Sequence, residues 1–390
     1  MKYRQMLSAL FKFIEPDRES VCFMSFYGLY NDNPKYISEK LHQLHPAIKI
    51  YWCIDYNRCN ISEIPDYVHV VQMGGVQKLI IQNKCRVLVD NLAGWYSMAI
   101  VKSDCFLINM IKNKKVYNLS TWHGTPLKRI GIDAYENKNG LTFFTTSDLL
   151  MSNSKYTDII YKQCFQDKME IRLTGTPRND ILVNIDKKRI NDIKKKFGIE
   201  DGYRLVIYAP TFRDSGTGLN DNENFDFMYG IDVQMVVNSL KKRFGGEWKF
   251  IFRGHQFDQK KNDFKSFRKL MGVEIIDGNL FEDMAEYLAI SDVLITDYSG
   301  SLFDFIITGR PCFLYTPDKE FYEKSIRGVY EITIPYKYNV NNEELAESIC
   351  KFDEIKYCKA IEQFAKKLGV FEDGKASVRA VEIIMEQLRK

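Results

Sequence analysis

The sequence predicts an α/β protein with two domains, each built on a parallel β-sheet. At 390 residues the chain is too long for one ordinary hydrophobic core. After Pro16, short apolar runs alternate with amphipathic helical stretches, a pattern typical of βαβ units. A charge-rich helical stretch at 186–197 interrupts this alternation, which then begins again. It is either a contact to a polyanion or lipid or, more commonly, a solvated helix near a domain boundary. In such sheets, ligands bind beyond the carboxyl ends of the strands, so polar residues at those ends are the candidates for function.

Apolar runs of strand length precede the charged stretch at 21–26, 48–54, 68–72, 86–90, 116–121 and 149–153. Apolar residues at helical spacing predict helices in this half at 36–44 and 76–82. In the second half, strands are predicted at 204–209, 248–253, 273–276, 293–295 and 312–315. The helices predicted there lie at 235–244, 280–288, 355–368 and 378–388.

The composition is that of an ordinary globular protein, with 45% hydrophobic and 27% charged residues. A formal net charge of +4 gives no case for nucleic acid as a partner, although it does not oppose binding to anionic lipid. Nine cysteines without a CxxC pair argue for a reducing compartment and against a disulfide framework or a zinc site. No apolar run is long enough to span a bilayer. Residues 1–16 have the pattern of a short basic amphipathic helix, which packs either on a membrane surface or, more commonly, on the protein itself.

The most informative segment is 290–311, ISDVLITDYSGSLFDFIITGRP, which predicts a strand, a polar turn and a helix N-terminus. Free backbone N–H groups and the helix dipole favour a phosphate at such a point. Ser299 and Ser301 add hydroxyl donors, and Gly300 lets a ligand come close to the backbone. An ordinary turn with Ser301 as the helix N-cap explains the segment equally well.

Two of the five histidines, His123 and His255, stand beside glycines directly after predicted strands. The pKa of an imidazole suits general base catalysis, and such turns leave a side chain accessible. His255 follows Arg253 and Gly254, where it can donate to a phosphate oxygen. A histidine that only hydrogen-bonds its own turn is the alternative at each position.

Arginine and threonine residues stand at the same strand ends. Arg178 offers a planar donor fork to a phosphate, or pairs with Asp180 and ties its own loop. Thr211 and Arg213 can bind a phosphate or a ribose, or stabilise the turn in which they lie.

Two aspartates flank the serine-containing turn. Asp297 ends the preceding strand, and Asp304 lies one turn into the helix. From there the Asp304 carboxylate can orient a histidine or accept from a hydroxyl, or merely complement the helix dipole.

The sequence lacks the motifs of several other classes of enzyme. The sequence has no GxxxxGK[ST] P-loop, no GxGxxG after the first strand, and no HExxH or clustered aspartate pair for a metal. The remaining histidines, arginines and serines suit binding of a nucleotide diphosphate and transfer of a group attached to it, without a protein-bound metal.

Seven segments occur in this order: WHGTPLKRIG (122–131), GTPRND (175–180), YAPTFRD (208–214), RGH (253–255), SDVLITDYSGSLFDF (291–305), GRPCFLY (309–315) and FEDGKASVR (371–379). Together they resemble the CDP-glycerol glycerophosphotransferase family, which includes wall teichoic acid primases and polymerases and related capsule enzymes. Residues 1 to about 115 share only the general βα character of that family.

The resemblance implies a GT-B-like fold, with two Rossmann-like domains facing across a cleft. An acceptor-side domain would span 17–185 and a CDP-polyol-binding domain 186–370. The C-terminal helix within 371–390 would pack back on the first domain.

The resemblance also implies an activity. A polyol phosphate, glycerol phosphate in the first instance, would pass from CDP-glycerol or another CDP-polyol to a hydroxyl of a lipid-linked saccharide or growing cell-surface glycan, with release of CMP. No cofactor would be needed. The enzyme would serve teichoic acid or capsule synthesis in the cytoplasm, peripherally at the inner face of the cell membrane. The length of the chain favours a primase or short-chain enzyme.

Carried across residue by residue, the resemblance implies His123 as the general base, with His255 and Asp304 as further catalytic residues. The implied substrate-binding residues are Trp122, Gly124, Thr125, Pro126, Arg178, Thr211, Phe212, Arg213, Arg253, Gly254, Asp297, Ser299, Gly300 and Ser301.

One position departs from the family pattern. The family usually has two adjacent serines after the Asp-Tyr pair, and here they are Ser299 and Gly300. Either Ser301 or a backbone N–H takes the place of the second hydroxyl. The polyol, the acceptor and the oligomeric state stay open. Two other functions also stay open: a GT-B glycosyltransferase that would release UDP from a nucleotide sugar, and a non-catalytic nucleotide-binding scaffold.

Overall fold

The computed structural model describes residues 13–73, 76–92, 99–101, 113–135, 142–211, 230–254, 275–279, 283–319 and 328–390. The chain forms two compact units. Unit 1 consists of Met1–Gly124, Ile130–Val183 and Leu368–Lys390, and unit 2 consists of Thr125–Arg129 and Asn184–Lys367. The sequence-based division placed its boundaries at 185 and 370 and did not separate Thr125–Arg129 from the first domain.

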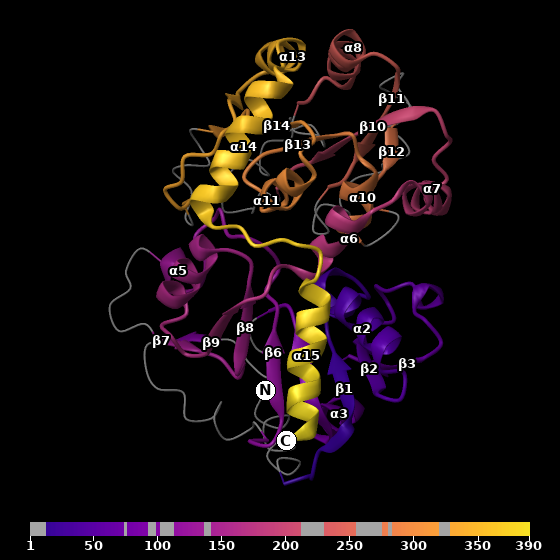
Figure 1. Ribbon diagram of the computed structural model, residues 1–390, viewed down its shortest axis with the longest axis vertical. Helices are drawn as coiled ribbons and strands as arrows, with labels where there is room; N and C mark the ends of the chain where they lie inside the picture. Colours follow the sequence, from indigo (N-terminus) through magenta and orange to yellow (C-terminus); the bar gives the residue numbers. More distant parts are fainter. Residues whose placement is uncertain are drawn as a thin grey trace. The chain divides into compact units, whose positions relative to one another are not determined.

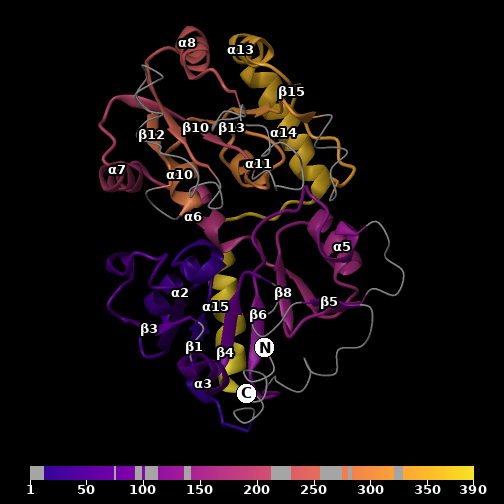
Figure 2. The same cartoon turned by 180° about the vertical axis from the view of Figure 1, so that it is seen from behind.

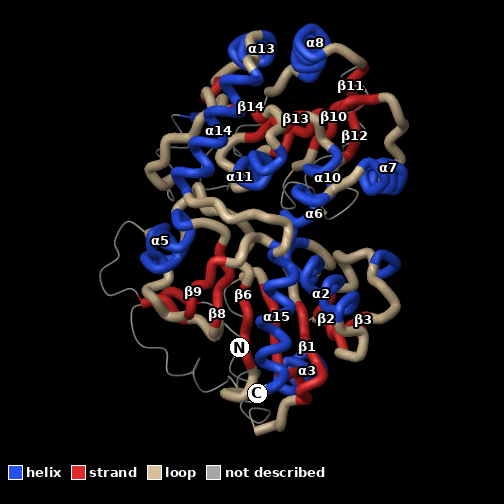
Figure 3. The backbone as a smooth tube through the Cα atoms, viewed as in Figure 1, coloured by secondary structure: helices blue, strands red, loops and turns tan. Residues whose placement is uncertain are grey.

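In the described part of unit 1, seven strands form one sheet in the order β3-β2-β1-β4-β6-β8-β9, with every neighbouring pair parallel. The sheet can be followed in Figures 1 and 2, and its strands are among the red segments of Figure 3. These strands are β1 (Asp17–Phe23), β2 (Lys49–Ile54), β3 (Val68–Gln72), β4 (Cys85–Asp90), β6 (Tyr117–Ser120), β8 (Leu149–Ser152) and β9 (Glu170–Leu173). A separate antiparallel pair consists of β5 (Ala99–Val101) and β7 (Thr142–Phe144).

The helices of unit 1 are α2 (Asp32–Leu44), α3 (Val76–Lys84), α5 (Lys155–Cys164), α6 (Asp180–Asn184) and α15 (Ala376–Arg389). Its short 3-10 helices are η1 (Phe26–Gly28), η2 (Ile61–Glu63), η3 (Gly131–Ala134) and η4 (Pro177–Asn179).

The two faces of this sheet follow the alternation of strand side chains. In β1, Val21 and Phe23 pack into a core cluster that includes residues of α2 and α15, whereas Cys22 and Met24 pack into a cluster on the other face. Helix α15 is the last element of the chain, yet it lies along this sheet beside α2 (Figures 1 and 2). The C-terminal segment is therefore part of the core of unit 1.

Unit 2 repeats the architecture. Its described strands form a parallel sheet in the order β12-β11-β10-β13-β14-β15. The strands are β10 (Tyr203–Ala209), β11 (Glu247–Phe252), β12 (Ile275–Asp277), β13 (Val293–Thr296), β14 (Cys312–Tyr315) and β15 (Tyr338–Asn339). The helices are α7 (Lys187–Lys196), α8 (Val233–Phe244), α10 (Met284–Ile290), α11 (Ser301–Phe305), η6 (Ile306–Thr308), α13 (Asn342–Cys350) and α14 (Glu354–Leu368).

The strand order of the two sheets locates their ligand sites. In each sheet the first strand lies between the second and the fourth, so the order reverses beside it. Chain segments leaving those two strands diverge, and the crevice that they leave at the carboxyl ends is where α/β sheets bind ligands. This rule places the expected crevice after β1 and β4 in unit 1, and after β10 and β13 in unit 2.

The parallel strands confirm the predicted fold class, and most predicted strands are present within one to four residues of the expected ends. The helices α5, α6 and α13 and the strands β5, β7, β9 and β15 were not predicted from the sequence. Strand β9 is short and only partly buried, so it lacks an apolar run. Helix α2 begins at Asp32 rather than at 36, because Pro34 occupies its first turn, where a missing N–H has no intrahelical partner to lose.

The packing of α15 gives a stability prediction. Ile384 on α15 is fully buried, whereas Ile355 on α14 is 84% exposed. Ile384→Ala removes buried methyl groups and leaves a cavity, so the free energy of unfolding should fall by about 2–5 kcal/mol in urea titrations. Ile355→Ala is the matched control and should change it by about 0.5 kcal/mol or less. Equal effects of the two variants would contradict the assignment of α15 to the core.

Candidate active site

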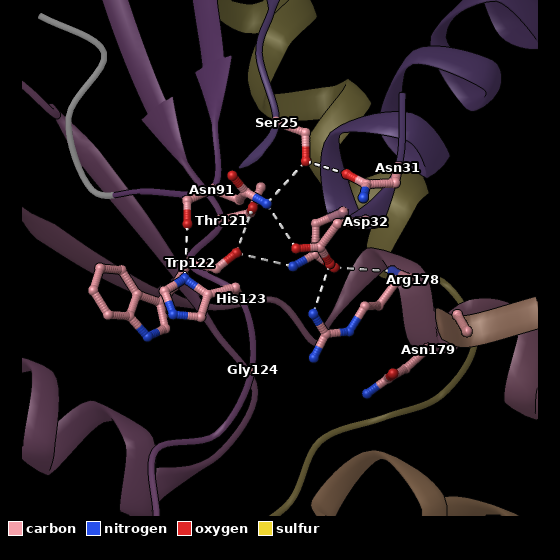
Figure 4. A network of polar contacts seen from close by, with 12 residues as sticks. Ser25, Asn31, Asp32, Asn91, Thr121, Trp122, His123, Gly124, Arg178 and Asn179 are labelled. Atoms are coloured by element: carbon pink, nitrogen blue, oxygen red, sulfur yellow. Dashed lines mark hydrogen bonds and ion pairs between the residues drawn. The ribbon is translucent and has the colours of Figure 1, made fainter. Parts of the chain in front are cut away.

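The crevice edge of unit 1 presents His123, which follows β6. Its Nδ1 lies 2.9 Å from the backbone carbonyl oxygen of Asn91, the residue that follows β4 (Figure 4). A carbonyl only accepts, so Nδ1 carries the proton, and in the neutral ring Nε2 is the basic nitrogen. No residue in the described ranges hydrogen-bonds this Nε2. The alternative that His123 bonds only its own turn is wrong.

Aromatic rings hold the imidazole in place. The Trp122 ring stacks on it at a centroid distance of 4.2 Å, and the Phe26 ring meets it edge-on at 4.9 Å. Burial in these surroundings lowers the pKa of His123 below its ordinary value, since desolvation disfavours the imidazolium. The hydrogen bond to Asn91 and the Asp32 carboxylate raise the same pKa, and Arg178 lowers it. The ring is therefore neutral at pH 7, the form that a general base requires.

The backbone before His123 is strained. Trp122 has a φ of +52°, a left-handed conformation that a bulky L-residue rarely adopts. The Asn33 side chain donates to the Trp122 carbonyl oxygen at 3.1 Å and helps to hold this peptide. Strain of this kind persists only where surrounding contacts compensate for it, and it is commonest at functional sites.

Arg178, on η4, lies beside Gly124 and has an unexpected partner. Its Nη1 donates to the Asp32 carboxylate at 2.6 Å, and the two side chains are only 14% and 8% exposed. The predicted alternative, a pair with Asp180, is wrong. Gly124 has a φ of +122°, and a Cβ built there would lie 2.6 Å from Nη2 of Arg178. Glycine at 124 therefore leaves room for the guanidinium.

Asp180 has a structural role instead. Its carboxylate accepts from the backbone N–H groups of Ala376 and Ser377 at 2.9 and 2.8 Å, at the first turn of α15. Glu372 accepts from the Thr176 N–H at 3.0 Å and from the Asn179 side chain at 3.2 Å. Segments 175–180 and 371–379 are two of the seven segments that resemble the family. These contacts bind them to each other within unit 1.

At the crevice edge of unit 2, Asp297 ties the ends of two neighbouring strands together. Both of its carboxylate oxygens accept from the Thr211 N–H, at 2.9 and 3.0 Å. One residue earlier, the Thr296 hydroxyl donates to the Ala209 carbonyl oxygen at 2.7 Å. The buried Asp297 carboxylate thereby fixes the chain as it leaves β10 and β13.

The turn after β13 holds two half-buried hydroxyls together. The Ser301 hydroxyl donates to the Ser299 hydroxyl at 3.0 Å, and the Ser301 N–H donates to the same oxygen at 3.3 Å. The N-cap residue is Gly300, so the alternative role of Ser301 as N-cap is wrong. A Cβ at Gly300 would lie 3.0 Å from the Thr125 carbonyl oxygen, which gives a physical reason for glycine where the family has a second serine.

The Arg253 side chain is partly buried and the Asp304 side chain is buried. The Arg253 guanidinium bonds the Gly278 carbonyl oxygen and lies 5.1 Å from the centre of the Tyr287 ring. Gly254 is buried, and a Cβ there would lie 3.3 Å from the Phe252 ring. Asp304 is buried on α11, and its predicted catalytic role stays a prediction.

The structure distributes the predicted residues over both units. His123 has Trp122, Gly124 and Arg178 with it in unit 1. The predicted residues of unit 2 are Thr125, Pro126, Thr211, Arg253, Gly254, Asp297, Ser299, Gly300, Ser301 and Asp304. His255, Phe212 and Arg213 lie outside the described residues.

The sequence analysis missed four polar residues around His123: Ser25, Asp32, Asn33 and Asn91. The first three follow β1 and the last follows β4, the two strands that border the crevice. These residues would have been candidates if the order of the strands had been known, because they follow the two strands beside which the order reverses. The strand order could not be predicted from the sequence.

The described residues also lack two other features. Among them, no group of three or more histidine, cysteine, aspartate or glutamate residues could hold a metal ion. None of the helices within the described ranges combines the length and apolar character needed to cross a membrane.

Comparison with known proteins decides the family. The family described as CDP-glycerol:poly(glycerophosphate) glycerophosphotransferase matches residues 7–386. The chain belongs to this family.

Curated relatives share about a quarter of the residues of this chain. It is 27% identical to a teichoic acid poly(glycerol phosphate) polymerase of Bacillus subtilis, over 95% of this chain but 49% of that protein. It is 28% identical to a teichoic acid glycerol-phosphate transferase of Staphylococcus aureus, over 95% of this chain and 94% of that one. The chain thus spans about half the length of some curated relatives and nearly all of others. The chain also covers 98% of a teichoic acid poly(glycerol phosphate) polymerase of Bacillus spizizenii. The names polymerase and transferase therefore do not correspond to different chain lengths.

The solved structure of the wall teichoic acid polymerase TagF superposes on this chain with a TM-score of 0.76. The match covers 100% of this chain and 94% of that one, at 24% identity. At this identity the likeness shows the fold alone, and it confirms the predicted fold class.

The Asp180 contacts give a second stability prediction. Asp180→Ala removes the acceptor of two N–H groups at the start of α15, and should lower the free energy of unfolding by about 0.5–2 kcal/mol. Asp201→Ala, at an exposed turn residue, is the control and should change it by less than about 0.5 kcal/mol. Chemical denaturation measures both, and an unchanged midpoint for Asp180→Ala would refute the capping role.

Proposed function

We propose that this protein transfers glycerol phosphate from CDP-glycerol to a hydroxyl of an acceptor glycan and releases CMP. The family match across residues 7–386 supports the reaction class. The observation that carries the chemistry is His123, neutral and held through Nδ1 with Nε2 as its basic nitrogen. An imidazole in this state can take a proton from an attacking hydroxyl.

The proposed step is an in-line displacement. The acceptor O–H gives its proton to Nε2 of His123 as its oxygen attacks the phosphorus that carries glycerol. A new P–O bond forms, the bond from that phosphorus to the CMP oxygen breaks, and the electron pair leaves with CMP. No covalent enzyme intermediate or cofactor is part of the proposal.

The donor diphosphate is proposed to bind at the crevice edge of unit 2. Ser299 and Ser301 place two hydroxyls and a helix N-terminus there, next to the chain fixed by Asp297. Such donors can stabilise the charge that develops on the leaving phosphate. His255 and Arg213 stay predicted contributors to this site.

The acceptor is proposed to be a lipid-linked saccharide or a growing glycan at the inner face of the cell membrane, in teichoic acid or capsule synthesis. The names of the relatives support teichoic acid as the product class. The predicted membrane-contact helix at 1–16 falls almost entirely outside the described residues.

The reaction is tested by measuring CMP release from the purified chain with CDP-glycerol and CDP-ribitol, each with and without a lipid-linked disaccharide. Acceptor-dependent CMP from CDP-glycerol is the expected result. CMP from CDP-ribitol alone would change the donor. UDP released from a panel of UDP-sugars, with no CMP from either donor, would overturn the proposal in favour of a glycosyltransferase.

Replacement of the proposed base gives the next prediction. His123→Ala should lower kcat by at least about 10²–10⁴-fold, because no other group in the proposal takes the proton. His69→Ala is the matched control, since His69 is exposed on β3, and it should retain wild-type turnover. Full activity of a folded His123→Ala protein would remove His123 from the mechanism.

The pH profile follows from the lowered pKa of His123. The base works in its neutral form, so kcat/KM should rise with pH through a pKa below the ordinary imidazole value of 6.5 and then level off. Initial rates of CMP release from pH 5 to 8 measure this limb. An apparent pKa above 6.5 would contradict the burial of a neutral imidazole.

A further inference from the structure

We infer that Asp32 is a positioning residue for His123, acting through Asn91 and Arg178. The inference rests on the proposed function, in which His123 is the base. Asp32 itself lies in none of the segments that carry the family resemblance.

Asp32 is held in an unusual conformation. It is the first residue of α2, is buried, and has a φ of +58°, a region that aspartate visits only occasionally. Such a backbone conformation is strained and persists only where other contacts compensate for the strain. The contacts of its carboxylate supply that compensation.

The two carboxylate oxygens of Asp32 bind different partners. Oδ1 accepts from Nη1 of Arg178 at 2.6 Å, and Oδ2 accepts from the side-chain amide of Asn91 at 2.7 Å (Figure 4). Because an ionised carboxylate can only accept, the Asn91 amide must present its NH2 group to Asp32. The same NH2 group donates to the Ser25 hydroxyl at 3.1 Å.

These contacts reach the imidazole through one residue. The side chain of Asn91 is fixed by Asp32 and Ser25, and its main-chain carbonyl accepts from Nδ1 of His123. A carboxylate that anchors the partner of a histidine sets the orientation and tautomer of the ring without touching it. Asp32 therefore acts on the geometry of the base from one residue away.

Asp32 also balances the charge near the ring. The charged groups that act on His123 in the described ranges are Asp32, which raises its pKa, and Arg178, which lowers it. In the wild-type protein the two form an ion pair and partly cancel. Removal of the carboxylate alone leaves the Arg178 cation uncompensated in a buried site.

The alternative is that the Asp32–Arg178 pair only fastens α2 to η4. Asp32→Asn distinguishes the two roles. A structural role changes stability alone, whereas a positioning role also lowers the pKa of His123 and turnover.

The test measures the His123 pKa by NMR titration of the whole protein, which is tractable with five histidines. In Asp32→Asn the His123 pKa should fall below the wild-type value. In Arg178→Gln it should rise, and in the double variant it should return towards wild type. Asp17→Asn, which removes the surface pair with Lys49 in the same unit, is the matched control and should leave the titration unchanged.

Turnover gives the second readout. Asp32→Asn should lower kcat by about 10–100-fold with little change in KM, the range typical when partners that orient a metal-bound histidine are lost. The acid limb of kcat/KM should move to lower pH. The Asp17→Asn control should keep the wild-type kcat and the wild-type position of the acid limb.

An unchanged His123 titration in folded Asp32→Asn would overturn the inference and leave Asp32 a structural residue. If that variant does not fold, Arg178→Gln decides, since an unchanged His123 pKa there would also overturn it. A wild-type chain that releases no CMP would instead overturn the proposed function, and the NMR titrations would still report on Asp32.

Discussion

The hydrogen bond from Nδ1 of His123 to the main-chain carbonyl of Asn91 is the interaction on which the candidate site depends. This bond decides which nitrogen of the ring is basic. Its acceptor is a main-chain carbonyl, which a side-chain substitution does not remove. The strained backbone of Trp122 and Asp32, and the buried ion pair of Asp32 with Arg178, surround this one bond. The position of the base is therefore set by residues other than the base itself.

The fold brings these residues together through strand order. Asn91 and His123 follow β4 and β6, while Asp32 follows β1, and these three strands are consecutive in the sheet of unit 1. In unit 2 the same order places Thr211 and Asp297 after β10 and β13, where they bond each other. Both crevices thus arise from one topological rule applied twice in the chain.

The fold class and the position of His123 could be predicted from the sequence, because apolar runs and a glycine-flanked histidine are local signals. The partner of Arg178 could not. Sequence spacing favoured Asp180, which is two residues away, but Asp180 binds the start of α15. Arg178 pairs instead with Asp32, 146 residues earlier. Asp32 carried no signal of its own, since an aspartate before Asn-Pro is typical of an ordinary turn. Contacts set by the order of strands stay hidden until that order is known.

The most direct test of this account is the tautomer of His123, read from the ¹⁵N chemical shifts of its ring nitrogens above the pKa of the imidazole. The account predicts a protonated Nδ1 and a bare Nε2, because the Asn91 carbonyl can only accept. A protonated Nε2 with a bare Nδ1 would contradict it, since the ring would then offer no base to an acceptor hydroxyl.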